Sequence, residues 1–462
     1  MPDTNPAPTA FVPADLNIAE WGQLEPLFQK LLDRPIASAT ELQVWLEDFS
    51  ALSAAIDEYG SRRYIDKSCN TESKEIEAAF MHFVEAIEPK VKPLYFELQK
   101  KFIASPHRSG LTDKRFQMLV RNWQSEVELF RPENIDLETQ VTKLVNEYDK
   151  IFGSMMVEFR GQTYTPQQIA RFLEDVDRTT REEAWKASTA RRLIEREKID
   201  KLYDDLRPIR DRIAKNAGLP DYRAFAFKAK KRFDYTPEDC YKFADAVEKS
   251  VMPVLRKLQA RRKKELGLEK LRPWDLSVDP QNRPPLRPFD PKDIDGFVAK
   301  TRSIFERLSP ELAKDFDNLK THGNLDLGSR KGKQPGGYQI SLDQSKQPFI
   351  FMNAAGLHRD VETLLHEGGH AFHYQWAAAN EPLTFLRSAP MEFCEVASMS
   401  MELLGMEHFD VFYGLGDDYK RARPPSSKAT RRCSRGSQRS TCSSTGSTPI
   451  RTTPQNSARP SG

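Results

Sequence analysis

The stretch Leu364-Leu365-His366-Glu367-Gly368-Gly369-His370 lies at the centre of an apolar segment and carries the pattern H-E-x-x-H. On an α-helix, residues i and i+4 lie one turn apart on the same face, so His366 and His370 can bind one metal ion. Glu367 projects roughly 100° around the helix from His366, where it can face a water molecule on that ion. Two histidine nitrogen ligands, an adjacent general base and an open coordination position on the metal are typical of zinc hydrolases. A chance match is the alternative interpretation, and the surrounding sequence argues against it.

A catalytic zinc ion needs a third protein ligand, and Glu395 is the candidate. Glu392, Glu395 and Glu402 share one stripe of a predicted helix. Buried carboxylates need a partner, and a metal ion or a metal-bound histidine is a suitable one. We therefore expect Glu395 to be a metal ligand. We expect Glu402 or Glu392 to orient a metal-bound histidine without binding the metal itself. We expect much of this helix to be buried, because the stripe alternates with the apolar residues Phe393, Val396, Met401, Leu403 and Leu404.

The segment over residues 330–402 resembles the catalytic centre of the M3 family of zinc oligopeptidases, in particular its oligoendopeptidase F branch. The resemblance implies a third zinc ligand at Glu395. It also implies a mainly α-helical, clam-like fold of the zincin type, with a small β-sheet beside the active-site helix and a channel that admits short peptides. Gly368 departs from the family, in which a bulky apolar residue is common at this position. The pieces that carry the resemblance are residues 330–333, 336–338 and 348–353, the His366–His370 motif with its extension to His373, and Phe393-Cys394-Glu395.

Residues 325–353 contain the one convincing β region. Residues 338–342 alternate in polarity, and residues 349–352 are a short run typical of a buried strand. Gly336 and Gly337 precede the alternating strand, where the lack of a side chain permits close backbone approach. The family resemblance implies that an edge strand here binds the substrate backbone by strand addition. Gly336, Gly337, Tyr338 and Asn353 are therefore candidate substrate contacts, although structural roles explain Tyr338 and Asn353 equally well.

Amphipathic helices are predicted along most of the remaining chain. We divide it into a disordered leader over residues 1–13, an N-terminal helical domain over 14–192 that forms a wall and lid of the channel, and a catalytic domain over 193–423. The leader has four prolines and no basic residue, so it is neither a signal peptide nor a transit peptide. Pro208 and Pro253 should kink or divide their helices. The predicted helices cover residues 42–59, 74–102, 139–152, 166–174, 195–217 and 237–266, with one more beginning near Thr179.

The composition, with 30% charged and 39% apolar residues, is typical of a soluble helical protein. No apolar run approaches the length that spans a membrane. Cys69, Cys240 and Cys394, an odd and widely spaced set, argue against a disulfide framework and favour a cytoplasmic protein. Cys394 is either a soft metal ligand or, in the interpretation we favour, a core residue. We expect no nucleic-acid or membrane partner, while the oligomeric state and the cleavage preference stay open.

Residues 424–462 form a tail rich in Ser, Thr, Arg and Pro, with no acidic residue and with Ile450 as its only large aliphatic residue. Such a composition cannot bury enough apolar surface to fold, so we expect disorder. The tail carries seven basic residues, without which the net charge of +3 becomes −4. A basic arm for nucleic acid is one interpretation. We favour a reading-frame shift after Arg423, because synonymous codons can be chosen for the tail that, read in another register, encode an aromatic-rich helical sequence resembling that of the family.

The function implied by the motif and the resemblance is hydrolysis of short peptides. Zinc held by His366, His370 and Glu395 would activate a water molecule, and Glu367 would act as the general base. In the family, histidine and tyrosine side chains beyond the position of residue 423 donate hydrogen bonds to the oxyanion, and the tail contains neither residue type. Loss of one such donor typically costs about 10²–10³ in turnover, so we expect impaired activity. A non-catalytic remnant that binds zinc or peptide is the alternative, and a nucleic-acid-associated protein is another if the basic tail is genuine.

Overall fold

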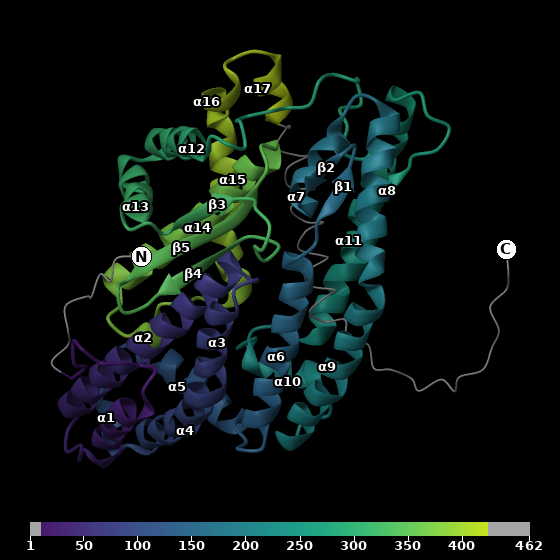
Figure 1. Cartoon of the computed structure of the whole chain (residues 1–462). Coiled ribbons are helices and arrows are strands. Elements are labelled where there is room, and N and C mark those ends of the chain that lie inside the picture. Colours follow the sequence, from purple (N-terminus) through teal and green to yellow (C-terminus); the bar gives the residue numbers. More distant parts are fainter. Residues whose placement is uncertain (1–10, 424–462) are drawn as a thin grey trace, which may run out of the picture.

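The computed structural model describes residues 11–423, which form a mainly α-helical protein with a small β-sheet beside helix α14, as the sequence predicts (Figure 1). The described residues contain no helix that is long and apolar enough to cross a membrane. The first helices, which lie together below the sheet in Figure 1, are α1 (Trp21–Asp33), α2 (Ala39–Cys69), α3 (Lys74–His82), α4 (Glu88–Ala104), α5 (Lys114–Leu129) and α6 (Asn134–Gly153).

These N-terminal helices pack around one apolar core. Phe28, Trp45 and Phe49 are fully buried in it, and Trp45 donates its indole N–H to the Leu31 carbonyl oxygen at 2.8 Å, so the buried donor is satisfied. Val12 also belongs to this core, with 4% of its surface exposed. The leader predicted over residues 1–13 is therefore wrong for residues 11–13, because an apolar side chain there finds a packing site. Residues 1–10 lie outside the described part of the chain.

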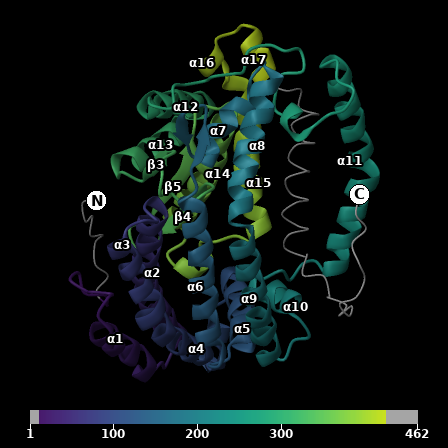
Figure 2. The same cartoon turned by 45° about the vertical axis from the view of Figure 1, so that its right-hand side comes forward.

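The middle of the chain consists of a hairpin and long charged helices. Helix α8 begins at Arg178, next to the predicted start at Thr179, because Asp177 accepts the backbone N–H groups of Thr179 and Thr180. Helices α9 and α11 continue through Pro208 and Pro253, so neither proline divides its helix. Figure 2 shows α11 at the margin of the molecule opposite α1 and α3. The elements are β1 (Val157–Phe159), β2 (Gln162–Tyr164), α7 (Pro166–Ile169), α8 (Arg178–Ile194), α9 (Arg196–Asn216), α10 (Tyr222–Ala229) and α11 (Pro237–Glu265).

The predicted β region forms a three-stranded sheet with the order β3-β5-β4. Strand β5 lies in the centre, parallel to β3 and antiparallel to β4, and its residues 348–352 are buried. Strand β4 is consequently an edge strand. The remaining elements are α12 (Ile294–Leu308), α13 (Pro310–Thr321), β3 (Leu325–Gly328), β4 (Tyr338–Leu342), β5 (Gln347–Ala354), α14 (His358–Asn380), α15 (Met391–Gly405), α16 (Asp410–Tyr413) and α17 (Asp417–Ala422).

Short π or 3₁₀ turns join several of these helices. The π turn η1 links α3 to α4, so the helix predicted over residues 74–102 is nearly continuous. These turns are η1 (Phe83–Ile87), η2 (Pro106–Gly110), η3 (Ala170–Glu174), η4 (Pro273–Asp275), η5 (Thr384–Leu386) and η6 (Met406–His408).

The glycine pair of the motif lets other elements approach helix α14. A Cβ atom on Gly369 would lie 2.7 Å from both the Ala397 carbonyl oxygen and the Ser398 Cα atom of helix α15. A Cβ atom on Gly368 would lie 2.8 Å from Cζ of Phe305. The glycines therefore leave no open gap at the motif, because the α15 backbone and a phenylalanine ring fill the space.

Helix α15 is more exposed than the sequence suggested. Only Ser398, Met401 and Gly405 are buried, whereas Phe393 is 64% and Leu404 is 54% exposed. The predicted burial is wrong because α15 packs on α14 through one face, and no element within residues 11–423 covers its opposite face.

The segment that joins α14 to α15 packs into the N-terminal helices. Leu383 is buried in their apolar core, and Phe385 packs against it with its ring 4.9 Å from that of Phe49. Arg115 on α5 also pairs with Glu381 at 3.1 Å. The division into domains 14–192 and 193–423 stays a prediction, and these contacts show that part of the second segment shares the core of the first.

Candidate metal centre

Two neighbouring helices bring the three predicted ligands together. His366 and His370 project from α14 and Glu395 projects from α15, and their ligand atoms all lie within 4.8 Å of one another. The Oε2 atom of Glu395 lies 3.3 Å from Nε2 of His366 and 3.7 Å from Nε2 of His370. The histidine side chains are mostly buried, while the Glu395 side chain is 47% exposed. The cluster thus opens toward solvent on the side of Glu395.

Glu402 and Ser398 of helix α15 form hydrogen bonds that orient the side chains of this cluster. Glu402 accepts a hydrogen bond from Nδ1 of His366 at 2.7 Å, which leaves Nε2 of that ring facing Glu395. Ser398, which is fully buried, donates its hydroxyl to Oε2 of Glu395 at 2.8 Å. The structure therefore places Glu402 where a ligand-orienting residue is expected. Ser398 was not predicted from the sequence. Its position three residues after Glu395 indicates that the two side chains are neighbours on one helix face.

Glu392, the other predicted orienting residue, lies elsewhere. Its carboxylate accepts a hydrogen bond from Nε of Arg232 at 2.7 Å. The expectation that Glu392 contacts a histidine is not met, because one helical turn before Glu395 the side chain points toward the segment that follows α10. Its pKa is lowered by Tyr235 and Arg232, which outweigh the opposing effect of burial.

Glu367 lies beside the cluster in a buried environment. Burial raises the pKa of this carboxyl to about 7, and the nearby Glu395 carboxylate acts in the same direction. Burial opposes the charged form of His366, but the hydrogen bond with Glu402 and the Glu367 carboxylate raise its pKa overall. Burial also lowers the pKa of His370. A carboxyl group with a pKa near 7 next to two histidines is suited to exchanging protons at neutral pH.

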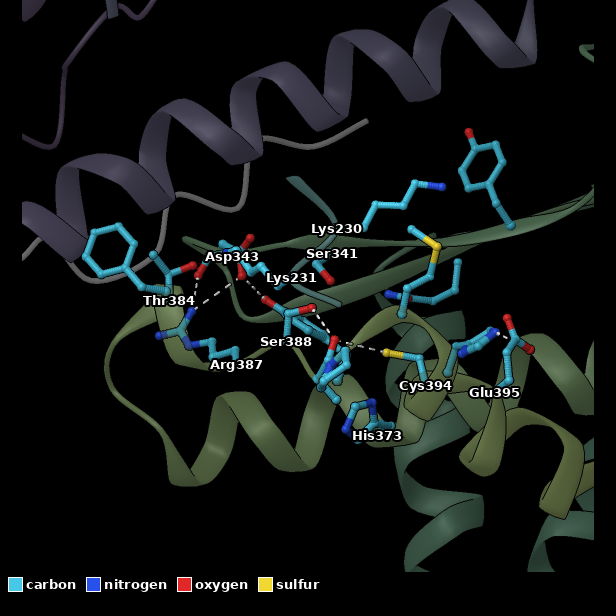
Figure 3. A pocket seen from close by; sticks show the side chains of 18 of the residues that line it. Lys230, Lys231, Ser341, Asp343, His373, Thr384, Arg387, Ser388, Cys394 and Glu395 are labelled. Carbon is cyan, nitrogen blue, oxygen red and sulfur yellow. Dashed lines mark hydrogen bonds and ion pairs between the residues drawn. The ribbon is translucent and has the colours of Figure 1, made fainter. Parts of the chain in front are cut away.

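The cluster opens into a cavity of about 670 Å³ between the N-terminal helices and the sheet. Strand β4 lines one wall with its edge, helices α14 and α15 line the second, and α5 and the residues after α10 line the third. Figure 3 shows the side chains that point into this cavity, with Glu395 at one end and Arg387 and Asp343 at the other. The volume is in the range of sites that bind small ligands or short peptides.

The predicted substrate contacts are arranged around strand β4. Gly337 lines the cavity, and a Cβ atom there would lie 3.6 Å from Oε1 of Glu367. Asn353 donates its side-chain N–H groups to the carbonyl oxygens of Gln334 and Gly336, both at 2.9 Å, and so holds the loop before the strand. Gly336 adopts a φ of 98°, which favours glycine.

Tyr338 lines the cavity as well, but its side chain is held by the scaffold. Its hydroxyl is hydrogen bonded to Ser68 of α2, and its ring stacks on Phe351 with centroids 4.8 Å apart. The Tyr338 hydroxyl is therefore engaged by the scaffold and is not a free group in the cavity.

Two further residues near the motif line the cavity without joining the cluster. The Cys394 thiol interacts with the Ala389 carbonyl oxygen at 3.6 Å, and His373 lies beyond His370. Neither belongs to the group of ligand atoms within 4.8 Å. Cys69, Cys240 and Cys394 are all free thiols in the described part of the chain.

Both halves of the chain match one family of proteins. Residues 171–439 match peptidase family M3, and residues 11–130 match the peptidase M3 N-terminal domain. The first match alone covers more than half of the chain, so the chain belongs to peptidase family M3. This match continues past Arg423 into the tail, whose residues lie outside the described structure. The frameshift stays a prediction, which the nucleotide sequence across the codons of Arg423 and Pro424 tests.

Individual relatives agree with this assignment. An oligoendopeptidase F homolog of Mycoplasma pneumoniae is 26% identical over 324 residues, which is 64% of this chain and 49% of the relative. Oligopeptidase A of Escherichia coli is 25% identical over 252 residues, 44% of this chain and 37% of that protein. The structure of PZ peptidase A with an inhibitor superposes with a TM-score of 0.82 at 28% identity, covering 87% of this chain and 71% of that one. This chain thus spans about half the length of the Mycoplasma relative.

Proposed function

We propose that the chain is a zinc-dependent oligoendopeptidase that hydrolyses short peptides. The observation that carries the proposal is the meeting of His366, His370 and Glu395 at the mouth of a peptide-sized cavity, with Glu367 beside them. The family assignment and the names of the relatives support a peptidase. The zinc requirement, the activity of this chain and its substrates are part of the proposal.

The donor atoms fit a zinc ion. Ligands at the usual bond lengths around a tetrahedral zinc ion lie roughly 3.3 Å apart, and Glu395 lies 3.3 and 3.7 Å from the two histidine nitrogens. Two imidazoles and one carboxylate are a ligand set of catalytic zinc sites. His366, His370 and Glu395 would hold the ion, and zinc bound there supplies the Lewis acidity that brings the pKa of water toward about 7.

The chain's own residues would perform the remaining tasks. Glu367, with a pKa raised to about 7, accepts the proton of the attacking water and returns it to the leaving amine. The free edge of β4 offers backbone groups to an extended peptide, which can pair with it as an added strand. The cavity walls exclude folded proteins because they enclose only about 670 Å³.

A turnover assay with matched metal analysis tests this proposal. With zinc loaded, Glu367→Gln should keep its metal and lose about 10²–10⁴ in the cleavage rate of a quenched fluorescent peptide. His366→Ala should lose both metal and activity. His322→Ala is the matched control, because His322 bonds to the Asn318 carbonyl oxygen at the end of α13. Equal turnover in Glu367→Gln and the parent would contradict the assignment of the base.

Impaired turnover is a further part of the proposal, because residues 424–462 contain neither histidine nor tyrosine to donate to an oxyanion. It is tested by comparing the 462-residue chain with one translated in the shifted frame after Arg423. Equal rates would refute the impairment. Stoichiometric zinc without any cleavage would instead support the alternative of a non-catalytic binding protein.

A further inference from the structure

The wall of the cavity formed by α5 and the residues after α10 is basic. It contributes Arg121, Lys230 and Lys231 to the lining. Two of these cations have an anionic partner: Lys231 pairs with Glu126 at 2.8 Å and Arg121 lies 3.6 Å from Asp234. Lys230 has no ion pair or hydrogen bond to any side chain within residues 11–423. Lys230 is therefore the one of these three cations whose ammonium forms no direct ion pair with a described side chain, although the Glu392 carboxylate acts on it electrostatically.

The surroundings of Lys230 leave it available. Figure 3 shows its side chain extended into the pocket, and no interaction drawn there ends on it. Glu392, the acidic residue that acts electrostatically on Lys230, accepts a hydrogen bond from Arg232 at 2.7 Å. Partial burial lowers the pKa of the Lys230 ammonium, and the Arg232 guanidinium adds to this effect. Lys230 is also exposed to solvent, so an anion that enters the cavity can reach its ammonium directly.

The other charges of the cavity point to the same conclusion. Arg387 at the far end is used by the protein, because it donates to the Asp343 carbonyl oxygen at 2.9 Å and lies 3.7 Å from its carboxylate. Glu367 and Glu395 belong to the metal centre. A peptide that enters the cavity brings its own anions, which are its C-terminal carboxylate and any aspartate or glutamate side chains.

We propose that Lys230 binds a carboxylate of the bound peptide and thereby makes the site favour peptides with a free C-terminus over amidated ones. The inference rests on the proposed peptide-binding function of the same cavity. A lysine is a compact point charge on a flexible stem, so it can follow a carboxylate at the end of peptides of different lengths. An acidic side chain of the peptide is the second source of the same chemical group.

Binding rather than cleavage tests the inference, so that a slow enzyme does not obscure the result. The full chain with Glu367→Gln is loaded with zinc, and fluorescence anisotropy measures its affinity for three labelled hexapeptides. One is neutral with a free C-terminal carboxylate, one is the same sequence amidated, and one is amidated with a single glutamate. The free acid should bind about 2–5-fold more tightly than the amide, as expected for an ion pair at a solvent-exposed lysine.

Substitution at Lys230 should remove this difference. Lys230→Met should weaken binding of the free acid by about 2–5-fold and leave the amidated neutral peptide unchanged, while Lys230→Arg should restore the preference. Lys228→Met is the matched control, because Lys228 pairs with Glu128 outside the cavity. If Lys230→Met affects only the glutamate-containing peptide, the carboxylate comes from a side chain and the preference for a free C-terminus is wrong.

The outcomes separate this inference from the proposed function. Equal affinity of Lys230→Met and its parent for every peptide, with binding retained, overturns the role of Lys230 and leaves the peptidase proposal standing. Absence of binding by all three peptides in all variants overturns both. Lys230→Met should melt at the same temperature as its parent, since the substitution breaks no ion pair within the described residues.

Discussion

Helices α14 and α15 supply the candidate metal centre together, yet they differ in how the protein supports them. Helix α14 is embedded in the core, with Leu364, Leu365 and Ala371 fully buried. Helix α15 packs on α14 with one face, while Phe393, Val396 and Leu404 are more than half exposed. Two of the three ligands and the base thus come from the buried helix, and Glu395 comes from the helix that is packed on one side.

The two halves of the site therefore have different structural requirements. The position of α14 is fixed by burial, which the apolar pattern around the motif reveals. The position of α15 is fixed by the close backbone contact at Gly369 and by the hydrogen bond between Glu402 and His366. Mutations should therefore affect α14 through global stability and α15 through metal affinity.

The largest difference should appear on truncating a leucine in each helix. Leu365→Ala removes a fully buried side chain of α14 and should lower the free energy of unfolding by about 2–5 kcal/mol. Leu404→Ala on α15 removes a side chain that is 54% exposed and should change it by at most about 0.5 kcal/mol. Urea denaturation followed by circular dichroism measures both. Similar losses would show that α15 is covered after all.

Adding one methyl group at Gly369 should separate the two helices. Gly369→Ala places a Cβ atom 2.7 Å from backbone atoms of α15 that cannot rotate away, so it should cost about 1–3 kcal/mol and weaken zinc binding. Gly22→Ala on α1 is the matched control, because no described atom beyond its chain neighbours and its own helix backbone lies within 4 Å of its added Cβ. Calorimetry and chelator competition report the two effects. Unchanged zinc affinity in Gly369→Ala would argue that α15 does not supply the third ligand.

Removal of the contact between Glu402 and His366 should weaken metal binding without unfolding the chain. Glu402→Ala is expected to lower zinc affinity by roughly 10–100-fold, because the hydrogen bond that orients the imidazole is lost. Glu407→Ala serves as the control, since Glu407 pairs with Arg423 away from the cluster. A competition titration with a coloured chelator gives both affinities. An equal effect of the two variants would remove Glu402 from its assigned role.

The smallest effect should come from the exposed face of α15. Phe393→Gln replaces a side chain that is 64% exposed and should alter the free energy of unfolding by less than about 0.5 kcal/mol. It should reduce the fluorescence of a dye that binds exposed apolar surface. Unchanged dye binding would mean that another segment, for example one beyond residue 423, covers this face.

Much of the fold could be predicted from the sequence, for reasons that these helices illustrate. Strong periodicity predicted most helices and the strands β4 and β5, and the motif placed His366, Glu367 and His370 on one helix. The exposure of α15 could not be predicted, because an apolar stripe shows that a face prefers burial and not that a partner is present. The partner of Glu392 is Arg232, 160 residues away in the chain, and no local pattern gives such a pairing. Lys230 was missed for the same reason, since only the fold brings it to the cavity.

The packing of Leu383 and Phe385 into the core of the N-terminal helices restricts how chains of this fold can be recombined. A chimera that takes α1–α5 from a relative but keeps its own segment 381–387 would pack together two surfaces that did not evolve in contact with each other. The same exchange would remove the ion pair between Arg115 and Glu381 wherever the relative has no basic residue at position 115. Both pieces have to be inherited as one unit, even though more than 250 residues of sequence separate Arg115 from Glu381.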